Sequence, residues 1–128
     1  MKILLISNNY WNFYNFRKGL IYNLINNGHD VSLIANDDSY SVKFEGENLK
    51  LYKVIFSSRK VSFFKEIILI IRLFRFIKFI KPDLILTFTI KPNIYASFIS
   101  RFLNIKVINN ITGLGSSFLN NRFIKNIT

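Results

Sequence analysis

Short apolar runs alternate with segments of helical periodicity along this chain. Each short run is apolar at most positions, as in KILLIS near the N-terminus, and this is typical of parallel strands that are buried on both faces. Polar residues, glycine or proline bound each run. The runs predict five strands, which are Lys2–Ser7, Val31–Ala35, Lys50–Phe56, Asp83–Phe88 and Lys106–Asn109.

Apolar residues between these strands recur at helical spacing, as at Phe13, Phe16, Leu20 and Leu24. Gly28 suits the position after the first helix, where a left-handed backbone is needed. Pro92 suits the first turn of a helix, because its missing N–H would be unpaired there. The predicted helices are Phe13–Asn27, Ser62–Lys81 and Pro92–Leu103, with a further one starting in Phe118–Ile127. The predicted connections include Asn36–Asn48, with room for one helical turn, Thr89–Lys91 and Thr112–Ser117.

The alternation of strands and helices predicts an α/β fold with a parallel sheet and right-handed crossovers. The buried character of Leu4–Ile6 and Leu84–Leu86 places their strands at the centre. We therefore expect the strand order 3-2-1-4-5, with helices on both faces. A chain of 128 residues fits one domain. In such sheets, ligands bind outside the carboxyl ends of the strands.

Composition excludes several kinds of site. The chain has no cysteine and one histidine, so it can form neither a disulfide framework nor a thiolate or multi-histidine metal site. We expect no metal, and we interpret His29 as a solvated turn residue. The seven carboxylates form no convincing acid/base pair, so the sequence shows no self-contained catalytic set.

Location is also constrained by the apolar runs. Met1–Ser7 is too short for the apolar region of a secretory signal. No uncharged apolar run approaches the roughly 18 residues that a spanning helix needs. We therefore expect a cytoplasmic location.

The formal net charge is +11, and part of it lies on the long helix Ser62–Lys81. One side of this helix is apolar and can face the sheet, with Leu69, Ile70, Leu73, Ile77 and Ile80. The other side mixes cations with apolar groups, which is how a helix lying in a membrane surface is composed. The residues expected at such a surface are Phe64, Ile68, Arg72, Arg75, Lys78 and Phe79. The alternative is that neighbouring helices bury these apolar groups and the cations are solvated. Nucleic acid is not expected, because no recognised motif accompanies the charge.

Asn8–Asn12 follows the first strand, where a dinucleotide-binding protein has a glycine-rich turn. It has no glycine, so that fingerprint is absent. The side chains of Asn8, Asn9 and Asn12 can still donate to phosphate or to sugar hydroxyls. Tyr10 and Trp11 could stack on a sugar ring, and the alternative is a packed loop with a buried tryptophan.

Two later loops carry further candidates. Thr89, Lys91 and Asn93 follow the fourth strand, and Lys91 is a point charge suited to a phosphate. Its alternative is an ordinary surface lysine. Thr112, Gly113 and Gly115 lie in a TGLG segment whose backbone N–H groups could form an anion nest, or merely a tight turn.

Several segments together resemble one family. These are KILLIS, Asn15-Phe16-Arg17 in the first helix, the GHDV segment at Gly28–Val31, and two more specific ones. The specific pair is TIKPNIY at Thr89–Tyr95 and TGLG at Thr112–Gly115, at their spacing. The chain resembles, over nearly its whole length, the N-terminal domain of bacterial family 4 glycosyltransferases of the GT-B fold. The nearest type builds capsule, O-antigen or lipid-linked oligosaccharides.

The resemblance implies a Rossmann-like three-layer α/β/α domain that binds the acceptor and docks on the inner face of the plasma membrane. The acceptor would be a saccharide linked to polyprenyl diphosphate, and the donor a nucleotide sugar bound by a second domain. Sugar transfer would be metal-independent, would retain the anomeric configuration and would need no cofactor. Candidate residues for acceptor or donor are Asn8, Asn9, Tyr10, Trp11, Asn12, Arg17, Thr89, Lys91, Asn93, Thr112, Gly113 and Gly115.

The sequence departs from the family pattern in three ways. Many relatives have a histidine in the loop after the fourth strand, where this chain has Thr89, Ile90 and Lys91. The first-loop glycines are missing. Residues 1–128 correspond to an incomplete N-terminal domain without a donor domain, so we expect the isolated chain to be inactive. The alternative functions are a membrane-associated, non-catalytic subunit that recruits a separate donor-binding chain, and an unrelated flavodoxin-like or nucleic-acid-binding module.

Overall fold

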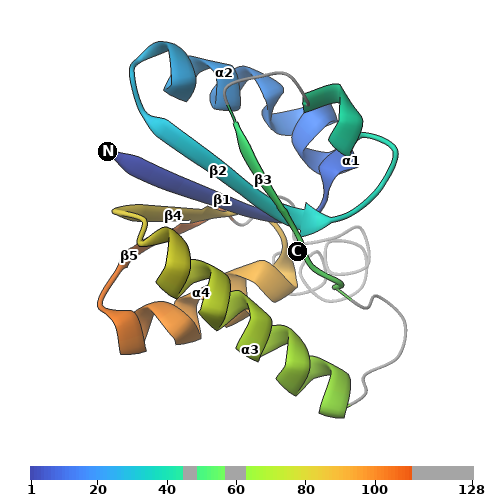
Figure 1. Cartoon of the computed structure of the whole chain (residues 1–128), viewed down its shortest axis with the longest axis vertical. Coiled ribbons are helices and arrows are strands. Elements are labelled where there is room, and N and C mark those ends of the chain that lie inside the picture. The colour runs from blue at the N-terminus through green and yellow to red at the C-terminus, as the bar shows by residue number, and fades with distance from the viewer. Residues whose placement is uncertain (45–48, 57–62, 111–128) are drawn as a thin grey trace, which may run out of the picture.

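The computed structural model describes residues 1–44, 49–56 and 63–110 (Figure 1). The predicted loop Thr112–Ser117 and the helix starting in Phe118–Ile127 lie outside these ranges. In chain order, the elements are β1 (Lys2–Asn9), α1 (Tyr10–Asn12), a π-helical turn η1 (Phe13–Arg17), α2 (Lys18–Asn26), β2 (Asp30–Asn36), a 3₁₀ turn η2 (Ser41–Phe44), β3 (Lys50–Lys53), α3 (Phe63–Ile80), β4 (Leu84–Thr87), α4 (Ile90–Leu103) and β5 (Lys106–Asn109).

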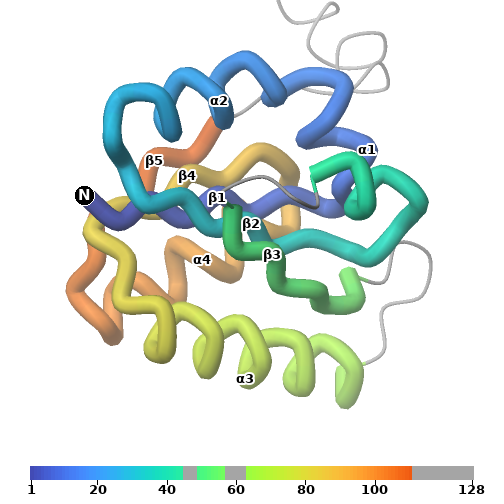
Figure 2. Tube along the Cα trace, turned by 45° about the horizontal axis from the view of Figure 1, so that its top comes forward, coloured from blue at the N-terminus to red at the C-terminus, as the bar shows by residue number. Residues whose placement is uncertain are grey.

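The sheet is parallel throughout the described residues and has the order β3-β2-β1-β4-β5, which confirms the prediction. Figure 2 shows α1 and α2 above the sheet and α3 and α4 below it, so the fold has three layers. Alternate residues of β1 serve the two faces. Leu4 and Ile6 pack with α3 and α4, whereas Ile3 and Leu5 pack with the first helical segment.

The first helical segment differs from the predicted regular helix, because it contains a π turn at Phe13–Arg17. A π turn holds one extra residue and so rotates the following positions around the axis. Ile21 is thus buried together with Phe13, while Phe16 and Leu20 are exposed. Gly28 has φ of +86°, which confirms its predicted left-handed position.

The junction after β1 is not the predicted loop Asn8–Asn12. The strand continues to Asn9, and helix begins at Tyr10. The side-chain oxygen of Asn9 accepts a hydrogen bond from the backbone N–H of Asn12 at 2.9 Å, which is a helix N-cap. Strand-to-helix reversal is therefore achieved with an asparagine cap and without the glycines of a dinucleotide-binding turn.

Strand β3 ends earlier than predicted because an asparagine side chain takes over its pairing. The amide of Asn36 accepts from the N–H of Phe56 at 2.6 Å and donates to its carbonyl at 3.1 Å. Helix α4 begins earlier than predicted, at Ile90, and Pro92 lies in its first turn. Ile90 and Lys91 thus belong to the helix.

Helix α3 has the two sides that its sequence predicts. Leu69, Leu73, Ile77 and Ile80 are buried against the sheet, and Ile70 packs partly against the same core. Phe64, Ile68, Phe79 and the three cations of the outer side are exposed. Among the described residues, no helix combines the length and apolar content that crossing a bilayer requires.

Candidate functional site

Polar residues lie at the carboxyl ends of the neighbouring strands β1 and β4. The two strands pair in parallel up to Ile6 and Thr87, where β4 ends, while β1 continues beside β2 to Asn9. From β1 the chain runs to β2 and β3 on one side, and β4 and β5 lie on the other. The carboxyl ends of β1 and β4 thus form the topological switch point, where α/β proteins bind ligands.

Among the described residues, five buried side-chain polar atoms lack a hydrogen-bond partner, and all belong to segments next to this switch point. We call their residues the switch-point cluster: Ser7, Asn8, Arg17, Thr89 and Asn93. A buried polar atom left unpaired costs about 1–3 kcal/mol. Five unpaired polar atoms around one strand end are therefore expected of a site whose hydrogen-bonding partner is a polar ligand.

Arg17 ends the π turn, and its guanidinium lies over the ring of Phe88, 4.7 Å from the ring centroid. Phe88 itself is buried and follows β4. The Nε atom of Arg17 is the unpaired one. The ring holds the planar guanidinium at the strand ends, where its N–H groups suit a phosphate.

The start of α4 contributes Thr89 and Asn93. Thr89 occupies the N-cap in an extended conformation, but its hydroxyl makes no capping bond. The N–H of Asn93 donates to the carbonyl of Thr89 at 2.9 Å. Helix N-termini carry partial positive charge and free N–H groups, so this end of a 14-residue helix favours an anion.

Hydrogen bonds fix this end of α4 against β5. The hydroxyl of Thr87 donates to the side-chain oxygen of Asn109 at 2.6 Å, and the Asn109 amide donates to Ser97 at 2.7 Å. The Asn93 amide donates to the carbonyl of Asn110 at 3.4 Å. The strand ends and the helix start are therefore held together as one unit.

Lys91 forms an ion pair with a residue of α3. Its Nζ lies 2.8 Å from Oε1 of Glu66, and the hydroxyl of Tyr95 donates to Oε2 of the same carboxylate. Both bonds lower the pKa of Glu66, and the bond from Lys91 has the larger effect. Burial, together with the bond to Glu66, raises the pKa of Tyr95 to about 12. The positive charge of Lys91 is thus partly neutralised within the protein.

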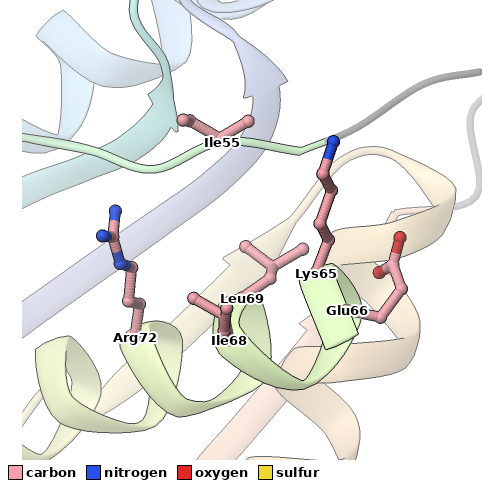
Figure 3. Close-up of a pocket in the computed structure, with 6 residues that line it drawn as sticks. All are labelled: Ile55, Lys65, Glu66, Ile68, Leu69 and Arg72. Atoms are coloured by element: carbon pink, nitrogen blue, oxygen red, sulfur yellow. The ribbon is translucent and has the colours of Figure 1, made fainter. Parts of the chain in front are cut away.

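A hollow of about 140 Å³ lies beside this ion pair, between the segment after β3 and the start of α3. Figure 3 shows Lys65 and Arg72 extending from α3 toward Ile55, while the carboxylate of Glu66 turns away from them. The hollow is therefore lined by cations and apolar groups, and its carboxylate is engaged with α4.

The other predicted site residues are placed differently. Tyr10 is fully buried, and its hydroxyl donates to the carbonyls of Tyr52 at 2.6 Å and Leu33 at 3.3 Å. Burial raises its pKa, and its ring cannot reach a ligand. Trp11 is exposed, so it is not the buried tryptophan of the alternative interpretation. Thr112, Gly113 and Gly115 lie outside the described residues.

Sequence reasoning missed three residues. Ser7 lies near the end of β1 and is completely buried. In the sequence it appears only as a polar residue that closes an apolar run. Glu66 and Tyr95 come from separate helices, and their contact has no sequence signature. Within the described ranges, no three histidine or acidic side chains gather where they could hold a metal ion.

A family profile described as glycosyl transferase 4-like matches residues 2–127, which is almost the entire chain. The chain belongs to the glycosyl transferase 4-like family. No curated protein matches this member of the family.

Solved structures share the fold of this glycosyl transferase 4-like chain. MurG of Acinetobacter baumannii is 16% identical, with a TM-score of 0.67 over 84% of this chain and 33% of that protein. A glycosyltransferase of Rickettsia africae is 16% identical, with a TM-score of 0.68 over 97% of this chain and 34% of that protein. The UDP-GlcNAc 2-epimerase of Neisseria meningitidis, solved with UDP-GlcNAc, has a TM-score of 0.64 at 16% identity, over 96% and 35% of the two chains. The chain spans about a third of the length of these proteins.

Proposed function

We propose that this chain is the acceptor-binding part of a glycosyltransferase acting in surface-polysaccharide biosynthesis. A second, donor-binding part would supply the nucleotide sugar, and the acceptor would be a saccharide linked to a polyprenyl diphosphate. The observation that carries this proposal is the set of five unpaired, buried polar atoms of the switch-point cluster. Membership of the glycosyl transferase 4-like family supports it.

The cluster suits the diphosphate of such an acceptor. Arg17 offers a planar group of donors, and the start of α4 adds backbone N–H groups and Thr89. No carboxylate is a member of the cluster. The residues of the cluster would thus bind and orient the acceptor. During transfer, a hydroxyl oxygen of the acceptor bonds to the anomeric carbon of the donor sugar, and the bond between that carbon and the nucleoside diphosphate breaks.

Geranyl diphosphate, a short prenyl diphosphate, is a suitable probe for this site. Arg17→Ala should weaken its binding about tenfold to hundredfold, because a hydrogen bond to a charged group contributes about 1.5–3 kcal/mol. Lys18→Ala is the matched control, since Lys18 is the next residue, is exposed and carries the same charge. Isothermal titration calorimetry measures both. Equal losses in the two variants would remove Arg17 from the site.

Lys91 remains a candidate for binding the same diphosphate. To do so, its ammonium group would leave the ion pair with Glu66 and bind the phosphate instead. Lys91→Ala should then weaken geranyl diphosphate binding, and Glu66→Gln should strengthen it, because Gln leaves the full charge of Lys91 for the ligand. The two variants together separate a phosphate role from a purely structural one. If both variants bind like the wild type, Lys91 serves only to join α3 and α4.

The second part of the proposal is that α3 and α4 form a membrane-binding surface on the cytoplasmic side. The two helices border a groove of about 500 Å³ that is lined mainly by apolar groups. Phe98 and Phe102 of α4 lie at this groove and are 54% and 70% exposed. Exposed apolar patches of this kind mark interaction surfaces.

An anionic bilayer fits this surface better than a second copy of the chain. Arg75 and Lys78 line the groove beside the aromatic rings, and Arg72 lies on the same helix. Two copies would bring these cations together, whereas anionic lipid headgroups would pair with them. A lipid-linked acceptor is presented at such a surface.

Vesicles of phosphatidylglycerol and phosphatidylcholine test this surface by co-sedimentation. Changing Arg75 and Lys78 to Gln should weaken binding about thirtyfold, because each cation contributes about 1 kcal/mol near an anionic surface. Changing Lys18 of α2 and Lys43 of η2 to Gln removes the same charge from elements that pack on the opposite face of the sheet, as seen for α2 in Figure 2, and should have little effect. Equal losses, or no binding by the wild type, would leave α3 as a core helix with a solvated side.

The third part is the need for a donor-binding half, in the same protein or in a partner chain. In the described residues, the sheet and its helices form the single layered unit seen in Figure 1. Sugar transfer by the 128-residue chain, measured with a panel of nucleotide sugars, should be undetectable. Repeated turnover without any added protein would contradict this.

A further inference from the structure

Two exposed aromatic rings lie side by side just after β1. Trp11 is 43% exposed and Phe16 is 61% exposed. Their ring centroids are 5.4 Å apart, and the rings meet edge to face at 81°. The π turn causes this pairing, since it turns Phe16 away from the core in which Phe13 is buried.

Hydrogen bonds hold the backbone beneath the two rings. The N–H of Trp11 donates to the carboxylate of Asp38 at 3.0 Å, and the amide of Asn15 donates to the carbonyl of Trp11 at 2.9 Å. The N-cap bond from Asn12 to Asn9 fixes the same turn. The rings are therefore presented on a rigid support, which lowers the entropic cost of binding a ligand.

The aromatic pair adjoins the switch-point cluster along the chain on both sides. Asn8, a cluster residue on β1, comes three residues before Trp11, and Arg17 directly follows Phe16. A ligand whose diphosphate lies at Arg17 would thus have its next group near the two rings.

The side chains around the rings have the chemistry of a sugar site. Asn8, Asn9, Asn12 and Asn15 lie within four residues of Trp11, and each amide both donates and accepts hydrogen bonds, as sugar hydroxyls require. The C–H face of a pyranose ring is apolar and can lie against an aromatic ring. The α3–α4 groove is different, because its aromatic rings are surrounded by isoleucines and cations. That contrast favours a saccharide over a protein or lipid at Trp11 and Phe16.

We propose that Trp11 and Phe16 form a platform on which a sugar ring of the acceptor stacks. This deepens the proposed function and rests on it, since it names where the saccharide next to the diphosphate would lie. Phe16 then contributes to the affinity for the sugar through its ring, although its side chain has no polar group.

Tryptophan fluorescence tests the platform directly, because Trp11 is the sole tryptophan in the sequence. The 128-residue chain is titrated with chitotriose, maltotriose and mannotriose, which carry no phosphate. At least one should change the emission of Trp11 saturably. Phe16→Ala should weaken that binding about threefold to tenfold, and Phe16→Tyr should retain it.

Phe63→Ala is the matched control, because Phe63 also belongs to an exposed edge-to-face pair, with Phe64 at 6.2 Å. It should leave saccharide binding unchanged. No saturable change with any of the three saccharides, or equal losses in Phe16→Ala and Phe63→Ala, would overturn the platform. Because these probes lack a diphosphate, their result is independent of the geranyl diphosphate titration. Saccharide binding that survives a failure of that titration would leave the platform standing and the diphosphate site refuted.

Discussion

Lys91 of α4 and Glu66 of α3 form an ion pair of 2.8 Å that joins the helix at the switch point to the helix of the proposed membrane surface. Both side chains are mostly buried, with 27% and 14% exposed. Their separation of 25 residues means that only the packed fold brings them together.

The ion pair predicts a pH dependence of stability. The pKa of Glu66 is lower in the folded protein than the ordinary value of 4.5 for a glutamate carboxyl, so the contribution of the ion pair to stability is present above pH 4.5 and disappears as pH falls through the folded pKa. Glu66→Gln should therefore be less stable than the wild type at pH 7, with the difference shrinking in acid. Urea denaturation at pH 7 and near pH 3 measures this. A difference that is the same at both pH values would contradict the assignment.

Tyr10→Phe should destabilise the protein by about 1–3 kcal/mol, because it leaves a buried carbonyl of Tyr52 without its 2.6 Å bond. Tyr40→Phe is a matched control on the same face of the sheet, since Tyr40 is only partly buried. Chemical denaturation of both variants measures the difference. Similar small losses would show that the carbonyl of Tyr52 finds another partner, such as water, when the Tyr10 hydroxyl is removed.

Replacing Gly28 and Gly19 by alanine should change the stability of the protein in opposite directions. Gly28 has φ of +86°, so Gly28→Ala should cost about 1 kcal/mol. Gly19 lies in α2 with nothing within 4 Å of an added Cβ, so Gly19→Ala should stabilise by about 0.5–1 kcal/mol. Thermal unfolding of both variants gives the sign. Stabilisation by both would mean that the turn after α2 relaxes.

Alanine substitutions on the two sides of α3 should differ in their effect on stability. Leu73 is fully buried, so Leu73→Ala should cost about 2–5 kcal/mol of unfolding free energy. Ile68 is 52% exposed, and Ile68→Ala should cost well under 1 kcal/mol while weakening vesicle binding. Urea denaturation measures the first effect and co-sedimentation the second. A large loss of stability in Ile68→Ala would assign its side to the core.

The sequence determined the fold because its signals are local. Buried strands such as KILLIS, the helical spacing of Leu69 and Leu73, and the glycine after the first helix each act within a few residues, and together they yield the parallel order β3-β2-β1-β4-β5. The two sides of α3 followed from periodicity for the same reason.

Tertiary structure alone decided the site. In the helical segment with the π turn, Phe16 is exposed while Tyr10 and Phe13 are buried, although all three are aromatic residues within seven positions. Pairing of β1 with β4 brought the end of β1 beside the end of β4, Arg17 came to lie over Phe88, and packing of α3 against α4 brought Glu66 to Lys91. These contacts join residues far apart in the chain, and their energies depend on burial and on the geometry of both partners, which no local pattern records.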